Sequence, residues 1–249
     1  MDGAELDKAE RGARFLPSGD TALTVELGER VDRSLSAAVI DLAARIDSAG
    51  LAGIVEIVPT FRSMLVHYDP LLTSADALER QITGLLDHPT AARQSGRRWR
   101  IPACYEADFA PDLDEVARRT GLPPAQVVEQ HTAESYHVYM LGFLPGYPYM
   151  GDVPDAIQLP RRESPRVRVP AGSVAIATSL TAVYTIEGPA GWHLIGRTPV
   201  PFFDLRGEPP ALLRPGDSVT FEAISRDAYD RLAAEVANGG FDTASLMAA

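Results

Sequence analysis

The chain has 249 residues, of which 45% are hydrophobic and 23% charged, as expected for one large folded domain or two ordinary ones. Its formal net charge of −11 argues against nucleic acid or an anionic membrane as a partner, because phosphate groups are bound by clustered positive charge. The single cysteine, Cys104, excludes an intramolecular disulfide, and neither a membrane-spanning apolar run nor a secretion signal is visible. We therefore expect a cytoplasmic protein.

The first half of the chain alternates between strand and helix patterns. Residues 22–27 alternate apolar and polar side chains, and apolar residues then recur at helical spacing until Gly50. The predicted elements are a strand at 22–27, a helix at 34–48, strands at 54–58 and 64–68, a helix from the N-cap Ser74 to Asp87, and a strand at 98–105. This β-α-β-β-α-β order predicts a ferredoxin-like domain over residues 14–108. A flexible tail is expected at 1–13 and a polar loop at 88–95.

Beyond residue 108 the pattern changes to short strands separated by turns. Residues 142–172 are rich in Gly and Pro but interleaved with aromatic side chains, which indicates an ordered, sharply turning segment. The predicted elements are helices at 113–119, with Asp112 as a possible cap, and 124–131, strands at 136–141, 173–177, 180–186, 193–195 and 218–224, and a helix at 226–236 after Ser225. Such a pattern predicts a β-barrel or sandwich over residues 109–226, followed by a carboxy-terminal helix and tail at 227–249.

Lysine occurs once in the chain, as Lys8. Phosphate-binding P-loops, Schiff-base sites and Ser-Ser-Lys amidase triads each need a lysine in the folded site, and so does biotin attachment, so none of these is expected. Ser173 lies in Ala-Gly-Ser-Val rather than in a Gly-x-Ser-x-Gly elbow, which argues against a serine hydrolase. The histidines have no metal-ligand spacing, and no structural zinc site is predicted.

A long series of motifs runs through the second half of the chain. It comprises Tyr136–Tyr147, Leu159–Arg161, Pro165–Ala177, Gly191–Pro199 and Leu213–Asp217, and the first half adds Val58–Pro70 and Pro102–Tyr105. The series closely resembles the family of the B-type subunit of the ATP-dependent 5-oxoprolinase. This family has also been labelled allophanate hydrolase subunit 1, and it includes the sporulation kinase inhibitor KipI.

The resemblance implies an α+β protein, with a ferredoxin-like amino-terminal domain followed by a cyclophilin-like β-barrel domain. It also implies one subunit of an enzyme, inactive alone, that works with a C-type (KipA-like) subunit and uses ATP with Mg²⁺ to activate 5-oxoproline. A separate A-type subunit then opens the ring to give L-glutamate. Two alternatives remain open: an inhibitor of a histidine kinase, like KipI, or a carboxyltransferase component that acts on a urea-like substrate.

The sequence departs from the family in a segment that the resemblance places at a wall of the site. A stretch that the family usually has as Gly-Gly-Gln-Thr-Gly is Thr178-Ser179-Leu180-Thr181-Ala182 here. Leucine at position 180 has neither the donor nor the acceptor of a glutamine amide, and the larger side chains restrict the backbone. Leu180 and Thr181 are therefore expected near the substrate, and the departure bears on which substrate is bound.

Arginines are the first candidates for substrate binding, because a planar guanidinium grips a carboxylate or phosphate at two points. Arg161, Arg166 and Arg197 are predicted to bind the substrate, with Arg161 and Arg166 as the preferred pair beside the turn-rich segment. The alternative for each of them, and for Arg168, is an ion pair with one of the many Asp and Glu residues.

Catalytic roles are predicted for His131 and Asp204. A histidine that titrates near neutrality can act as a general acid or base, and the alternative for His131 is a structural role that fixes a helix end or a loop. Asp204, and with less reason the turn residue Asp217, could hold magnesium that carries ATP. The aromatic residues Tyr136, Phe143 and Tyr149 are predicted to line the substrate site, with core packing as the alternative.

Overall fold

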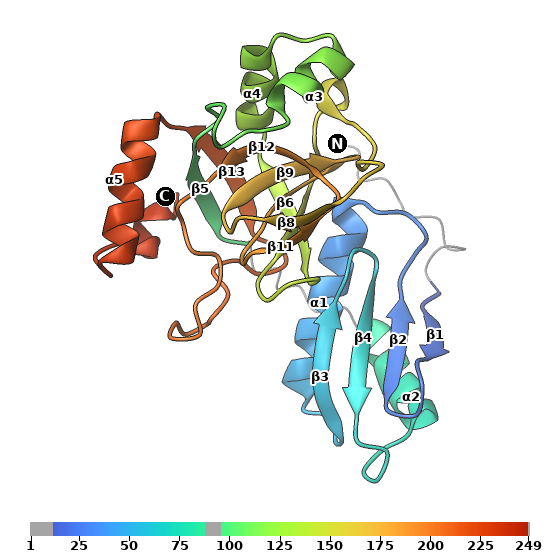
Figure 1. The fold of residues 1–249 in the computed structure, drawn as a ribbon. Helices are drawn as coiled ribbons and strands as arrows, with labels where there is room; N and C mark the ends of the chain where they lie inside the picture. The colour runs from blue at the N-terminus through green and yellow to red at the C-terminus, as the bar shows by residue number, and fades with distance from the viewer. Residues whose placement is uncertain (1–11, 88–95, 249) are drawn as a thin grey trace, which may run out of the picture. The chain divides into compact units, whose positions relative to one another are not determined.

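The computed structural model describes residues 12–87 and 96–248. Contacts divide the chain into two compact units, one up to residue 94 and one from residue 95 (Figure 1). Most of the expected tail at 1–13 and the whole of the expected loop at 88–95 lie outside the described residues. Among the described helices, none has both the length and the apolar character needed to cross a bilayer.

The first unit is an antiparallel sheet covered by two helices. Its elements are β1 (Arg14–Pro17), β2 (Ala22–Glu26), α1 (Arg33–Ala49), β3 (Ile54–Pro59), β4 (Ser63–Tyr68) and α2 (Ala75–Leu86). The strands lie in the order β1-β2-β4-β3. Local sequence signals fix the helix ends, since Gly50 adopts the left-handed conformation after α1 and the Ser74 hydroxyl accepts from the N–H of Ala77.

Apolar side chains from both layers form the core of this unit. Val39, Leu42 and Ile46 of α1 are buried against the sheet residues Val25 and Val66. These helix positions follow the spacing that predicted the helix, so its apolar face is the one that packs. The sequence pattern therefore gave the helices and three of the four strands correctly, and it missed β1.

The second unit contains a seven-stranded sheet. Its strands are β5 (Arg98–Ala103), β6 (Tyr136–Leu141), β7 (Pro148–Gly151), β9 (Ser173–Ala177), β10 (Leu180–Val183), β12 (His193–Arg197) and β13 (Ser218–Ala223), in the order β12-β9-β10-β7-β6-β13-β5. The two edges meet at one end, because Cys104, just after β5, exchanges two backbone hydrogen bonds of 2.8 Å with Arg197 of β12. The sheet is thus a nearly closed barrel, which is consistent with a cyclophilin-like fold.

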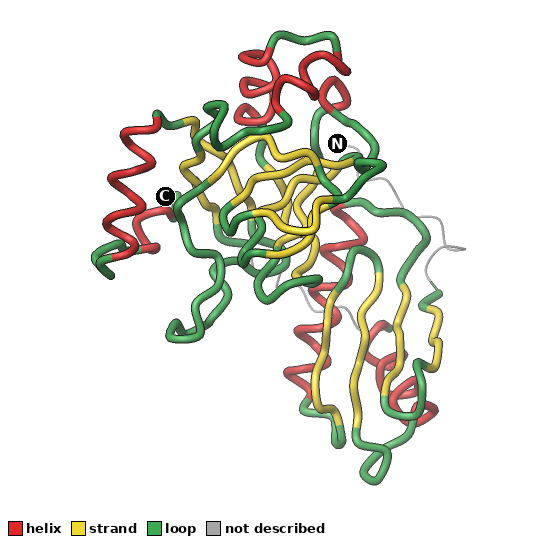
Figure 2. The backbone as a smooth tube through the Cα atoms, viewed as in Figure 1, coloured by secondary structure: helices red, strands yellow, loops and turns green. Residues whose placement is uncertain are grey.

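Helices and a small ribbon cover this barrel. The helices are α3 (Leu113–Thr120), α4 (Pro124–Ala133) and α5 (Arg226–Ala237), with short 3-10 turns η2 (Asp155–Ile157) and η3 (Thr243–Leu246), and the ribbon pairs β8 (Arg166–Val169) with β11 (Gly188–Ala190). In Figure 1, α3 and α4 lie together over one part of the barrel, and α5 lies beside β5. The longest connection, residues 198–217 between β12 and β13, is irregular (Figure 2).

One strand was predicted in the wrong unit. The sequence placed the strand at 98–105 as the last strand of a ferredoxin-like domain ending at Asp108, but β5 pairs in parallel with β13 from Arg98↔Ser218 to Ala103↔Ala223. The first unit therefore has the order β-β-α-β-β-α, and the contact division falls before β5 rather than after Asp108. Pairing with a strand some 120 residues away is a non-local property that the strand pattern itself does not carry.

Candidate functional site

Asp112 organises the loop that carries the predicted arginines. It does not cap α3 as expected, because its side chain makes no capping hydrogen bond. Instead its buried carboxylate accepts two hydrogen bonds from Arg166, of 2.6 and 2.8 Å, one of 3.1 Å from Arg162, and one of 2.7 Å from the N–H of Leu194. Burial by itself raises the pKa of Asp112, but Arg166 and these other donors outweigh it and hold the pKa below its usual value.

This pairing separates the two arginines that the sequence preferred. Arg166, whose side chain is 28% exposed, is engaged in an ion pair with the buried Asp112. The exposed Arg161 has no ion pair with any described residue, and its guanidinium lies over the ring of Trp192, 5.9 Å from the ring centre. Only Arg161 of the pair therefore keeps its guanidinium donors available for a ligand.

Arg161 borders a cluster of aromatic rings. Tyr147 is packed edge-on against Tyr149 and Tyr184, each with ring centres 5.1 Å apart, and Trp192 lies 5.9 Å from Tyr149. Burial raises the pKa of all three tyrosines, while Arg161 acts in the opposite direction on each. The three phenols therefore stay protonated at neutral pH, and the buried hydroxyls of Tyr147 and Tyr184 bond to each other.

We call this group the aromatic–Arg161 cluster: Tyr147, Tyr149, Tyr184, Trp192 and Arg161. Its rings pack on the outer side of the barrel sheet with the small side chains Ala175, Ala177 and Ala182. Bulkier residues at these sheet positions would compete with the rings for the same space, so the small side chains permit the aromatic layer.

Phe143 forms an exposed edge of the cluster. Its ring lies 5.4 Å from that of Tyr147 and edge-on to it, yet 59% of the residue is exposed. Its φ of +69° is a left-handed conformation that bulky side chains rarely adopt. Backbone strain of this kind clusters at functional sites, which makes Phe143 a candidate ligand contact at the edge of the cluster.

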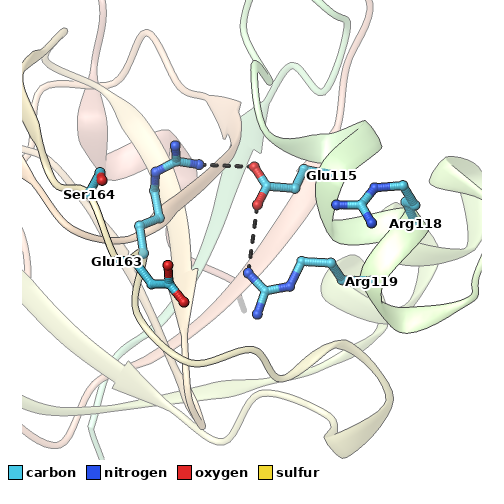
Figure 3. A pocket seen from close by; sticks show the side chains of 6 residues that line it. Glu115, Arg118, Arg119, Glu163 and Ser164 are labelled. Carbon is cyan, nitrogen blue, oxygen red and sulfur yellow. Dashed lines mark hydrogen bonds and ion pairs between the residues drawn. The ribbon is translucent and has the colours of Figure 1, made fainter.

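The same loop also borders a cavity of about 420 Å³. Residues of α3 and of the loop line it together: Glu115, Arg118, Arg119, Arg162, Glu163 and Ser164 (Figure 3). One oxygen of Glu115 lies 3.1 Å from Arg162 and the other 3.6 Å from Arg119. Adjacent Arg161 and Arg162 thus have different surroundings: the Arg161 guanidinium lies over the Trp192 ring, and that of Arg162 is paired with Asp112 and Glu115.

His131 is buried at the centre of a complete hydrogen-bond chain. Its Nδ1 lies 2.9 Å from the Tyr105 hydroxyl and its Nε2 lies 2.9 Å from the Thr181 hydroxyl, which is also 3.1 Å from the Ala175 carbonyl. Because the Thr181 hydroxyl donates its one proton to that carbonyl, Nε2 carries the ring proton and Nδ1 accepts from Tyr105. Burial lowers the pKa of His131 to about 3, so the ring is neutral.

This environment does not favour the predicted acid–base role of His131. The residue has 0% exposure, and both ring nitrogens are used within the protein. Tyr136, predicted to bind the substrate, is equally buried, and its hydroxyl donates to the His131 carbonyl at 2.8 Å. His131 and Tyr136 therefore anchor α4 to the barrel, and they do not line the aromatic–Arg161 cluster.

Stability should fall on acidification because of His131. Its pKa in the folded state, about 3, lies below that of an unfolded histidine, about 6.5, so the unfolded chain takes up a proton first and is favoured as the pH falls. We expect protonation of His131 in the unfolded chain to lower the free energy of unfolding by about 2 kcal/mol between pH 7 and pH 5. Urea titrations at both pH values measure the change. His131→Gln should be less stable than the wild type at pH 7, but its free energy of unfolding should fall less on acidification. An equal fall in both proteins would contradict the assignment of this pH dependence to His131.

The altered segment at 178–182 keeps a backbone shape suited to glycine. Thr178 has a φ of +51° in the turn between β9 and β10. Leu180 is half-buried and packs against the aromatic layer, whereas Thr181 is fully buried and serves His131. Of these two predicted substrate residues, only Leu180 lies next to the aromatic–Arg161 cluster.

Thr178→Gly is expected to raise the free energy of unfolding by about 1 kcal/mol, because a β-branched residue is strained at positive φ. Urea denaturation measures the change. The matched control is Ser179→Gly, at the next turn position, where φ is not positive. This control should lower stability by about 0.5 kcal/mol through added freedom of the unfolded chain. A less stable Thr178→Gly protein would show that the turn does not strain this residue.

The remaining predicted residues lie apart from the cluster. Asp204 is partly exposed and pairs with Arg206 at 2.8 Å, which lowers the pKa of Asp204 to about 2. Arg197 donates from Nε to the Ala171 carbonyl at 2.9 Å. Asp217 is buried, where Arg97 and the indole of Trp99 donate to it, so it is a structural anchor rather than a magnesium ligand.

Sequence reasoning missed two contributions to this region. Tyr184 was not selected, although it follows β10 beside the altered segment, and Asp112 was taken for a helix cap. The only signal for Asp112 was its position as an acid before a helix, which capping explains equally well.

The described residues do not by themselves fit magnesium-bound ATP. Within residues 12–87 and 96–248, no three His, Cys, Asp or Glu side chains gather as a possible metal site. Asp204, the acid predicted for this role, is already paired with Arg206. The sequence also lacks a lysine other than Lys8 to neutralise a nucleotide's phosphates. No chemical step is therefore assigned to a nucleotide within this chain.

Known proteins similar to this chain point to one family. Residues 13–213 match the family described as carboxyltransferase domain, subdomain C and D. The B-type subunit of 5-oxoprolinase from Bacillus subtilis (strain 168) is 39% identical over 222 residues, covering 85% of this chain and 92% of that protein. The protein of the same name from Escherichia coli O157:H7 is also 39% identical, over 84% of this chain and 95% of its own length.

Among solved structures, TTHA0988 is 36% identical with a TM-score of 0.74, covering 82% of this chain. This chain spans 40% of the length of TTHA0988. The resemblance expected from the motif series is thereby confirmed. The chain belongs to the carboxyltransferase-domain family, subdomains C and D, together with the proteins named as B-type subunits of 5-oxoprolinase.

Proposed function

We propose that this chain is the B-type subunit of an ATP-dependent 5-oxoprolinase, and that it works with a C-type subunit to activate 5-oxoproline. A separate A-type subunit then opens the ring to give L-glutamate. The names of the relatives that are 39% identical to this chain support the proposal. We further propose the cytoplasm as the location, where ATP is available.

The single observation that carries the proposal is the free Arg161 guanidinium beside aromatic rings. 5-Oxoproline is a small ring that bears one carboxylate and one lactam amide. Arg161, with no ion pair among the described residues, offers paired N–H donors to the carboxylate, and the exposed ring of Phe143 and the half-buried ring of Tyr149 offer an apolar surface to the substrate ring. A protonated tyrosine hydroxyl can donate to the lactam oxygen.

The chain alone offers binding groups rather than a complete catalytic set. Its buried histidine His131 is neutral and fully hydrogen-bonded, and its one lysine is Lys8. Activation of an amide oxygen by ATP needs groups that hold the phosphates and magnesium. We infer that a C-type partner supplies them, that ATP and Mg²⁺ are bound by the complex, and that the isolated chain is inactive.

Co-expression tests this function directly. The chain is produced with C-type and A-type counterparts from the same genome, and ATP-dependent glutamate formation from 5-oxoproline is measured. Turnover by the three-part assembly, with none by this chain alone, is the expected result. Absence of turnover by an intact assembly would defeat the substrate assignment, and assay with a urea-like substrate would then test the carboxyltransferase alternative.

A further inference from the structure

The buried carboxylate of Asp112 is bonded both to the loop that carries Arg161 and to the strand that follows Trp192. Asp112, whose side chain is 3% exposed, bonds to Arg162 and Arg166 on either side of the turn at 163–165, and to the backbone N–H of Leu194. Its own backbone N–H donates to the Leu194 carbonyl at 3.0 Å. Asp112 thus ties the loop that bears Arg161 to the strand that follows Trp192.

Further bonds dock this loop on both sides of Trp192. The N–H of Arg162 donates to the Gly191 carbonyl at 2.9 Å, and Nε2 of His193 donates to the Pro160 carbonyl at 3.0 Å. Arg161 lies between Pro160 and Arg162, the two loop residues that are held in this way. Its own side chain is long and makes no ion pair with a described residue, so the position of its backbone decides where the guanidinium can reach.

We propose that Asp112 is a positioning residue for substrate binding, which holds the Arg161 guanidinium over Trp192 by fixing Arg162, Arg166 and Leu194. The proposal rests on the function proposed above, in which Arg161 binds the substrate carboxylate. A displacement of about 1 Å is enough to weaken two-point recognition of a carboxylate. The charge of Asp112 matters because an amide in its place would turn one acceptor oxygen into an N–H donor that faces guanidinium donors.

A second buried aspartate in the same unit provides a matched control. Asp112 and Asp217 have the same exposure as whole residues, 2%. Asp217 accepts hydrogen bonds from Arg97 and from the indole of Trp99. The chain has two tryptophans, so its NMR spectrum contains two indole N–H signals. The Trp192 signal reports on the surroundings of Asp112, and the Trp99 signal reports on those of Asp217. Asp112→Asn should shift the Trp192 signal and leave that of Trp99 in place, and Asp217→Asn should do the reverse.

Kinetics of the assembled complex provide the second readout. Asp112→Asn is expected to raise KM for 5-oxoproline about 10-fold while kcat changes less, because loss of ground-state contacts appears in KM. Asp217→Asn, compared at a temperature where both variants are folded, should leave KM unchanged. An equal rise of KM in the two variants, or an unmoved Trp192 signal in folded Asp112→Asn, would overturn the positioning role.

A milder variant covers the case in which Asp112→Asn does not fold. Arg162→Gln removes the bonds to Asp112 and Glu115 but leaves the Arg166–Asp112 pair. It should shift the Trp192 signal in the same direction and raise KM, and no change in either would overturn the proposal. If the wild-type assembly itself lacks oxoprolinase activity, the proposed function fails, whereas the NMR comparison still decides whether Asp112 positions the loop.

Discussion

Arg161→Gln is expected to raise KM for 5-oxoproline about 10- to 100-fold in the assembled complex, the range that follows from losing a charged hydrogen-bonded contact of about 1.5–3 kcal/mol. Glutamine keeps much of the side-chain length but has neither the charge nor the forked donors of the guanidinium. The structural reason for choosing Arg161 is that it has no ion pair among the described residues and lies over Trp192. Initial rates of ATP-dependent glutamate formation measure the effect.

Arg168→Gln is the control for this experiment. Arg168 lies on β8 and its Nε is 2.6 Å from Glu187, with 75% of its side chain exposed. Its replacement should leave KM unchanged, because an exposed ion pair contributes little and Arg168 does not border the cluster. Equal effects of the two substitutions would indicate that general surface charge, rather than Arg161, sets the affinity.

Arg166→Ala is expected to lower the free energy of unfolding by about 3 kcal/mol, because it removes the principal partner of a buried carboxylate. The Asp112 side chain is 3% exposed and receives two of its hydrogen bonds from Arg166. Arg162 and the Leu194 N–H remain, which keeps the expected loss at the lower end of the range for broken buried pairs. Urea denaturation at pH 7 measures the change.

The pH dependence of this loss identifies its origin. The lowered pKa of Asp112 means that its contribution to stability is present above the unfolded pKa, about 3.9, and is lost as the pH falls through the folded value. The difference in free energy of unfolding between the wild type and Arg166→Ala should therefore become smaller as the pH falls. Arg168→Ala, from the same strand, should leave the free energy of unfolding nearly unchanged at any pH, because its ion pair is exposed. A pH-independent loss would assign the effect to packing instead.

Local signals in the sequence determined where α2 and α5 begin and where α1 ends. Ser74 and Ser225 cap α2 and α5 as predicted, and Gly50 ends α1, because capping depends on residues within one turn of the helix end. The strands β6 and β9 have the predicted bounds for the same kind of reason, since their side chains alternate or are uniformly apolar along a few consecutive residues.

The tertiary structure decided which strands belong together. The pattern at 98–105 correctly predicted a strand, but its partner β13 lies about 120 residues further along the chain. The short strands β8 and β11, of four and three residues, were missed because so few residues carry no reliable period. Only folding brings them together as a ribbon beside the aromatic layer.

The site shows the same division. The sequence by itself determined the family motifs and which arginines are candidates for binding. It gave no reason to prefer Arg161 over Arg166. Asp112, about 50 residues earlier, engages Arg166 and leaves Arg161 free, and burial keeps His131 neutral. Ion pairing and burial depend on distances through space that residue types and spacing do not encode, so only the folded chain could separate the unpaired Arg161 from the ion-paired Arg166.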